Sequence, residues 1–171
     1  TVTNPDSSTL LLTRGYQNSA ISDGLLTQTE VKTSGGTSMA KSVISYTTDG
    51  GGETQVANVV SYDDATPTAN QTKADFDYDS YGNVTNTREY GFQQSGSWVV
   101  RRRTHAVYKS DTGYVNAYLR SLITETDVYD AQLDTNDAND VLMAKTTYTY
   151  DDYNAMGGME DYGSTTYNIG H

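Results

Sequence analysis

The side chains that could do chemistry in this chain are two histidines, 22 carboxylates and a few aromatic rings. His105 and His171 are the only histidines, and no G-x-S-x-G sequence supplies a nucleophile that either could activate. A carboxylate pair for glycoside hydrolysis can be drawn from 22 acids almost anywhere, so no pair stands out. The chain has no cysteine, which excludes a thiolate nucleophile and a thiolate zinc site. The sequence therefore assigns no catalytic residue and no cofactor, and we expect a protein that is not an enzyme.

An acidic loop from Asp130 to Asp140 contains the one spacing that suggests a metal. Asp134, Asn136 and Asp140 are spaced as calcium-binding oxygens sometimes are. The loop lacks the central glycine and the distal glutamate of the EF-hand pattern. We therefore interpret it as a solvated acidic loop, with a weak calcium site as the alternative.

Two kinds of residue could contact a sugar. Trp98 is expected to anchor the core, or else to form a stacking platform with nearby tyrosines. Asn70 and Asn83 begin the sequons N-Q-T and N-V-T. Asn83 falls in a predicted turn where it already has a conformational role, so Asn70 is the better candidate for glycosylation.

Three consecutive arginines, Arg101 to Arg103, form the only basic cluster. On a strand, Arg101 and Arg103 lie on one face and Arg102 on the other. We expect them to pair with acidic residues of adjacent hairpins, with anion or partner binding as the alternative.

The elements that position these residues must be mostly strands. The 171 residues are enough for one ordinary domain, and they include 15 Tyr and 15 Gly but only two Pro. Short alternating runs bounded by Gly, Asn or Asp predict antiparallel hairpins over residues 42–46, 53–62, 73–78, 84–90, 98–108, 122–129 and 143–150. Short helices are predicted near 16–21 and 111–119.

The charge and hydropathy exclude two classes of partner. Eleven basic and 22 acidic residues give a net charge of −11, which disfavours nucleic acid and anionic membranes. The longest apolar run, Leu10 to Leu12, falls far short of the roughly 20 residues that cross a membrane. We therefore expect neither nucleic-acid binding nor membrane insertion.

An imperfect internal repeat organises the chain. LLTQTEV, which begins at residue 25, returns as LITETDV at residue 122, an offset of 97 (122 − 25), and residues 15–50 resemble 113–154 as a whole. The extra residues of the second copy fall in a polar loop. We predict a single β-rich repeat region over 1–171. Because both ends stop in mid-repeat without a capping unit, we expect chains either to join end to end into a polymer or to close a cage.

The segment from Phe76 to Phe92 resembles the tyrosine-aspartate (YD) repeat of bacterial Rhs proteins. The positions that match its pattern are Tyr78, Asp79, Gly82, Asn83, Val84, Thr85 and Gly91. Weaker versions stand at 22–27 and 147–154, and residues 101–130 resemble the linking units between YD repeats. Neither Pro5 nor Pro67 stands in the D-P-x-G context of the family's autoproteolytic segment, so no self-cleavage is assigned.

The resemblance implies β-hairpins that join edge to edge into a continuous sheet spiralling around a hollow interior, as a shell or solenoid. In members of the family that shell encloses a toxin domain. Each hairpin covers the open edge of its neighbour, and tyrosines such as Tyr78 and Tyr150 are expected to stack on one face with their hydroxyls in water.

The expected function is therefore structural. We expect a repeat module of an extracellular or cell-surface protein, whose partners are neighbouring repeats or copies of itself in a shell or fibre. Two alternatives remain: a module that binds carbohydrate or a cell surface through exposed Tyr and Trp, and a wall segment of a cage around a toxin domain.

Overall fold

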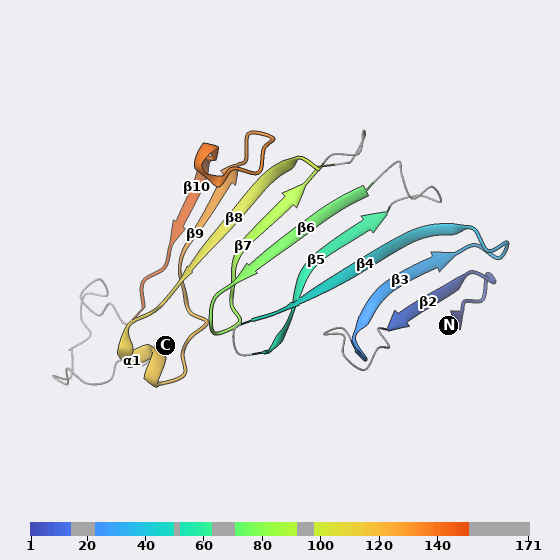
Figure 1. The fold of residues 1–171 in the computed structure, drawn as a ribbon, viewed down its shortest axis with the longest axis horizontal. Helices are drawn as coiled ribbons and strands as arrows, with labels where there is room; N and C mark the ends of the chain where they lie inside the picture. Colours follow the sequence, from blue (N-terminus) through green and yellow to red (C-terminus); the bar gives the residue numbers. More distant parts are fainter. Residues whose placement is uncertain (15–22, 50–51, 63–70, 92–97, 151–171) are drawn as a thin grey trace, which may run out of the picture.

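The computed structural model describes residues 1–14, 23–49, 52–62, 71–91 and 98–150, and these form one open antiparallel sheet (Figure 1). Ten strands lie side by side in the order of the sequence. They are β1 (Val2–Thr3), β2 (Thr9–Arg14), β3 (Leu26–Lys32), β4 (Ser38–Thr48), β5 (Thr54–Tyr62), β6 (Gln71–Tyr78), β7 (Val84–Tyr90), β8 (Val100–Tyr108), β9 (Ile123–Asp130) and β10 (Val141–Thr147). The prediction of a mainly β, antiparallel hairpin fold is confirmed, whereas the described strands make an open sheet and no spiral is seen in them.

Tight turns of one kind join several of these strands. In the turns that begin at Thr33, Asp49 and Asp79, the first residue donates its N–H to the carbonyl of the fifth residue. Its own carbonyl accepts the N–H of the fourth residue. The fourth residue is a glycine in the left-handed region, with φ of +83°, +85° and +81° at Gly36, Gly52 and Gly82. Glycine adopts this conformation without a steric penalty, so the turn glycines set where each hairpin reverses.

The helical content is smaller than the sequence predicted. Helix α1 (Thr112–Asn116) is shorter than the predicted 111–119, and Tyr118 just beyond it has a φ of +61°, which no longer fits a right-handed helix. A 3-10 turn, η1 (Asp137–Asn139), lies in the acidic loop. The helix predicted near 16–21 lies outside the described residues. Neither described helix is long and apolar enough to span a membrane.

The sheet is a single layer and buries little. In the described part of the chain only Val100 and Ala131 are buried apolar residues, while Gln71, Arg103 and Asp127 are buried polar ones. Most strand residues are half-buried, because no second layer among the described residues covers either face of the sheet. Stability must therefore come from cross-strand contacts within the sheet.

The two faces differ in chemistry. Residues directly opposite each other on paired strands point to the same side, so the register assigns each residue to a face. One side, which we call the charged face, carries Glu30, Lys41, Lys73, Asp75, Asp77, Arg88, Arg103, His105, Asp127 and Lys145. The other side is richer in small and apolar residues, although Glu89, Arg102 and Asp130 also lie on it; it carries Thr29, Ser42, Ile44, Val59, Ser61, Ala74, Phe76, Thr87, Thr104 and Val128.

Candidate functional site

Four tyrosines join successive hairpins through their hydroxyls, and we call them the anchor tyrosines (Tyr46, Tyr78, Tyr108 and Tyr150). Each stands near the end of an even-numbered strand or just beyond it, and donates its hydroxyl to a carbonyl near the start of the preceding strand. The bonds are Tyr46 to Leu26 (2.7 Å), Tyr78 to Val56 (2.8 Å), Tyr108 to Val84 (2.9 Å) and Tyr150 to Ile123 (2.9 Å). The same contact therefore recurs in four consecutive hairpins.

The anchor tyrosines form a chain of contacts across the sheet. Tyr46, Tyr78 and Tyr108 are paired with Val56, Val84 and Ile123 of the next strand, and each pairing follows a β-bulge. The carbonyls of those same three residues accept the hydroxyls of the next anchor tyrosines. Each hairpin is thus placed on the last by one backbone pair and one side-chain hydrogen bond.

The hydroxyls are held by the protein, which corrects the expectation that they stay in water. Burial raises the pKa of Tyr78 above its usual value, and it does the same for Tyr108, where the Asp79 carboxylate adds to the effect. A half-buried carbonyl left without a donor costs free energy, so each hydroxyl has a structural task.

The YD turn is held by its aspartate. The Asp79 carboxylate accepts the backbone N–H of Tyr81 and of Asn83, at 2.8 and 3.0 Å. It also accepts the side-chain amide of Asn83 at 2.8 Å. Asp49 accepts the N–H of Glu53 at 2.9 Å in the equivalent turn. The tyrosine and the aspartate of the motif therefore fix the end of a strand and the turn after it.

The Asn83 side chain connects this turn to the β8–β9 connection. Its Nδ2 atom donates both to Asp79 and to the carbonyl of Arg120, each at 2.8 Å. A glycan would be attached at this same nitrogen, which is already used twice. Asn70, the other glycosylation candidate, lies outside the described residues.

The remaining motif residues have backbone roles. Val84 provides the carbonyl for Tyr108, and Thr85 is the extra residue of the bulge between β6 and β7. A Cβ on Gly91 would lie 2.6 Å from Nε of Arg101, so a larger residue there would have to displace the arginine side chain. The motif residues predicted from the sequence thus surround one hairpin junction rather than a reaction centre.

A second recurring contact joins a cation to a tyrosine ring across neighbouring strands, and we call these the ring–cation pairs. They are Lys41 with Tyr62 (5.5 Å from the ammonium nitrogen to the ring centroid), Lys73 with Tyr90 (4.5 Å) and Arg103 with Tyr129 (4.1 Å from the guanidinium carbon). In each pair the two residues are directly opposite in the ladder. The cation is always on an even-numbered strand, and the ring is always near the end of the next strand.

Sequence reasoning missed this pattern, although the sequence carries a signal for it. A Lys or Arg stands five residues before each anchor tyrosine: 41 and 46, 73 and 78, 103 and 108, 145 and 150. The anchors themselves are 32, 30 and 42 residues apart (78 − 46, 108 − 78, 150 − 108). A hairpin-sized period therefore runs inside the longer repeat of about 97 residues.

The calcium candidates do not converge on one point. Asp140 forms an ion pair with Arg103, and the Asp140 side chain is only 3% exposed. Asp134 accepts the N–H of Asn136 at 2.7 Å, and Asn136 accepts the N–H of Ala138 at 3.3 Å. No three His, Cys, Asp or Glu side chains in the described ranges are grouped to hold a metal ion. The carboxylates of this loop accept hydrogen bonds within the turn or form ion pairs with arginines.

The other residues singled out in the sequence lie apart from one another. Trp98 packs edge-on against Tyr90, with ring centroids 6.0 Å apart. His105 stands on β8 between Asn86 and Asp127. Arg102 forms an ion pair with Glu89 of β7. His171 lies outside the described residues.

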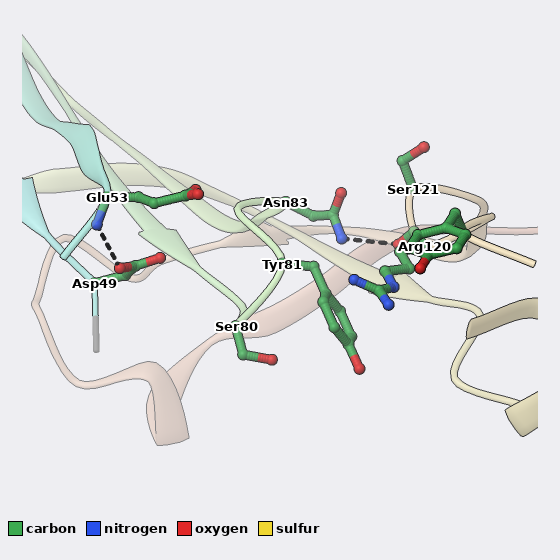
Figure 2. Close-up of a pocket in the computed structure, with 8 residues that line it drawn as sticks. Asp49, Glu53, Ser80, Tyr81, Asn83, Arg120 and Ser121 are labelled. Carbon is green, nitrogen blue, oxygen red and sulfur yellow. Dashed lines mark hydrogen bonds between the residues drawn. The ribbon is translucent and has the colours of Figure 1, made fainter. Parts of the chain in front are cut away.

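A shallow pocket of about 600 Å³ lies between the turns after β4 and β6 and the β8–β9 connection, which includes α1. Figure 2 shows Tyr81 and Arg120 among its lining residues. The Arg120 guanidinium lies 4.6 Å from the ring centroid of Tyr81 and 4.9 Å from that of Tyr118. Asp49, Glu53, Ser80 and Ser121 contribute to the remaining walls. Tyr118 is 80% exposed. Sequence reasoning did not single out these residues.

Comparison of the chain with protein-family models, with curated proteins and with solved structures finds no match.

Proposed function

We propose that the chain is a structural repeat module, which builds a shell or fibre by pairing hairpins edge to edge. The recurrence of the anchor-tyrosine contact in four consecutive hairpins carries this proposal. A contact that depends only on the preceding hairpin can be repeated indefinitely, as in other repeat proteins whose units contact only their neighbours. Such a protein needs no closed core and no catalytic site.

The outer strand β10 supports this function. Val141, Leu142 and Met143 are consecutive and exposed on it. An exposed apolar edge strand invites pairing with another strand, and proteins normally protect such edges with charge, proline or a covering element. We infer that this edge is covered by a further hairpin in the assembled protein.

The YD-repeat resemblance gives the proposal its setting. A segment of an Rhs-like repeat region would work outside the cell or at its surface, either in a fibre or as a wall of a cage around a toxin domain. The contacts of Tyr78 and Asp79 give the tyrosine and the aspartate of that motif a physical role, which fits this setting.

Electron microscopy of the protein as isolated tests the proposal. Filaments with a regular axial step would support a fibre, and hollow particles would support a cage wall. Compact particles the size of a single chain, at every concentration, would contradict both.

A second candidate function is ligand binding at the pocket beside α1. Tyr81 and Tyr118 flank the guanidinium of Arg120. Among the described residues, no carboxylate lies within ion-pair distance of this guanidinium. Exposed aromatic rings beside polar hydrogen-bonding groups are features of carbohydrate sites. Saturation-transfer NMR with a panel of oligosaccharides would test this function. Contact at the Tyr118 ring, lost in Tyr118→Ala, supports it, and no contact with any sugar contradicts it.

A further inference from the structure

Lys145 occupies the place of the cation in the ring–cation pairs, yet no aromatic ring in the described part of the chain lies over it. It stands on the charged face, five residues before Tyr150, as Lys41 stands five residues before Tyr46. The other three cations each face a tyrosine of the following strand. For Lys145, the following strand would be the one that pairs with the edge of β10 that no described strand covers.

The local geometry of β10 matches that of β4 closely. Ala40 and Ser38 pair with Val31 and Lys32, so Met39 is the extra residue of a bulge. Ala144 and Leu142 pair with Val128 and Tyr129, so Met143 is the extra residue in the same place. After the bulge, Lys41 is opposite Glu30 and Lys145 is opposite Asp127. The two lysines are therefore equivalent by register as well as by sequence.

The present contacts of Lys145 leave room for a ring. Its ammonium group lies 2.6 Å from Glu125 and 3.5 Å from Asp127, both on β9, and its side chain remains 44% exposed. Lys73 has a comparable ion pair with Asp75 at 2.8 Å while it also faces the ring of Tyr90. An ion pair and a ring contact are thus compatible on one lysine of this sheet.

We propose that the strand that covers β10 runs antiparallel to it and places a tyrosine directly opposite Lys145. This inference rests on the proposed function, because it names the chemistry of the partner at the same edge. The other edge of the described sheet is formed by β1 and by the part of β2 that β1 does not cover, and neither strand carries an aromatic residue. The partner is therefore a hairpin strand of the β5 type, which ends in tyrosine, rather than β2 of a second copy.

The register of this partner follows from the β4–β5 ladder. Lys41, Ser42 and Val43 pair with Tyr62, Ser61 and Val60. A β5-like strand on β10 would place its tyrosine opposite Lys145. The two residues that precede this tyrosine would lie opposite Thr146 and Thr147. Tyr148 donates its N–H to Thr124 of β9, and amides alternate in direction along a strand. The amides of Lys145 and Thr147 therefore point toward the open edge, where the partner would bind them.

A labelled peptide with the sequence of residues 53–62 tests the proposal when it is added to the full chain. Fluorescence anisotropy gives its dissociation constant, and hydrogen exchange locates the site by protection of the Lys145 and Thr147 amides. Peptides with Tyr62→Phe and Tyr62→Leu separate the ring from the hydroxyl. Chains with Lys145→Met and Lys145→Arg test the cation, and Lys32→Met, far from this edge, is the matched control.

We expect the Tyr and Phe peptides to bind β10 about equally and the Leu peptide to bind roughly two- to fivefold more weakly. Lys145→Met should weaken binding of the Tyr peptide to the level seen with the Leu peptide. Lys145→Arg and Lys32→Met should leave binding of the Tyr peptide unchanged. Equal binding of the Tyr and Leu peptides at β10 would overturn the tyrosine assignment and leave the proposed edge pairing standing. If no peptide protects β10, both are overturned.

Discussion

Tyr78 donates its hydroxyl to the carbonyl of Val56 at 2.8 Å, and Val56 is the residue paired with Tyr46 on the strand before. Val56 thus contacts two successive anchor tyrosines: it is paired with Tyr46 in the ladder, and its carbonyl accepts the hydroxyl of Tyr78. Because the same relation holds for Val84 and Ile123, the position of each hairpin is set by the one before it. These contacts fix the register of the described strands, which bury few apolar residues that could do so.

The hydroxyl of Tyr78 should contribute measurably to stability. Tyr78→Phe keeps the ring but leaves the Val56 carbonyl without its donor, which should lower the free energy of unfolding by about 1 kcal/mol. Tyr81→Phe is the matched control, because Tyr81 is 49% exposed and its hydroxyl makes no hydrogen bond with the described residues. Urea denaturation measures both variants. An equal loss in the two would contradict the role of the anchor hydroxyl.

Stability should fall in alkaline solution because tyrosines donate hydrogen bonds only when protonated. Burial raises the pKa of Tyr78 above its usual 10.0, and burial together with the hydrogen bond to Asp75 raises the pKa of Tyr90. A raised folded-state pKa means that the contribution is complete below about pH 10 and is lost as the pH rises through the folded-state value. Urea midpoints measured from about pH 8 to about pH 11 should decline, and less steeply in Tyr78→Phe. An unchanged slope in that variant would speak against the assignment.

The turn after Tyr78 depends on a glycine that carries the hairpin through a left-handed conformation. Gly82 has a φ of +81°, so Gly82→Ala should destabilise the chain by about 1 kcal/mol. Gly113 lies in α1, with open space around the position of a Cβ. Gly113→Ala should therefore be neutral or stabilising by up to about 1 kcal/mol. Thermal unfolding of the two variants checks this contrast, and equal melting temperatures would refute it.

Two adjacent arginines should differ sharply in their contribution to stability. The Arg103 side chain is 11% exposed, faces the Tyr129 ring and pairs with the almost fully buried carboxylate of Asp140. Arg103→Met leaves that carboxylate unpaired and should cost about 3 kcal/mol. Arg102 is 56% exposed and pairs with Glu89, so Arg102→Met should cost less than about 1 kcal/mol. Chemical denaturation that ranks the two in the opposite order would contradict this account of the charged face.

The strands from β4 to β10 could be predicted from alternation and turn residues, and β7 was predicted with its observed bounds. The strands β1, β2 and β3 were not predicted, although β3 repeats the sequence of β9. The helix at 111–119 was overestimated, because spacing alone does not reveal the left-handed backbone at Tyr118. Alternation of apolar and polar residues indicates which face of the sheet a residue lies on. It does not indicate where a strand or helix ends.

The site was predictable in part. The YD resemblance pointed to Tyr78, Asp79 and Gly82, and these residues do form a junction between hairpins. The acceptor of the Tyr78 hydroxyl, Val56, was not predictable, because it lies 22 residues earlier and is chosen by the sheet register. The ring–cation pairs were missed for the same reason, since the cation and the ring meet only once the strands are aligned.

Residue-resolved hydrogen exchange on β10 is the most direct test of the central claim that this edge is continued by another strand. In the assembled material, the amides of Lys145 and Thr147 should be protected roughly tenfold or more relative to the dissociated chain. The amides of Thr146 and Tyr148 point toward β9 and should be protected in both, which makes them the internal control. Equally fast exchange of Lys145 and Thr147 in the two states would contradict the account.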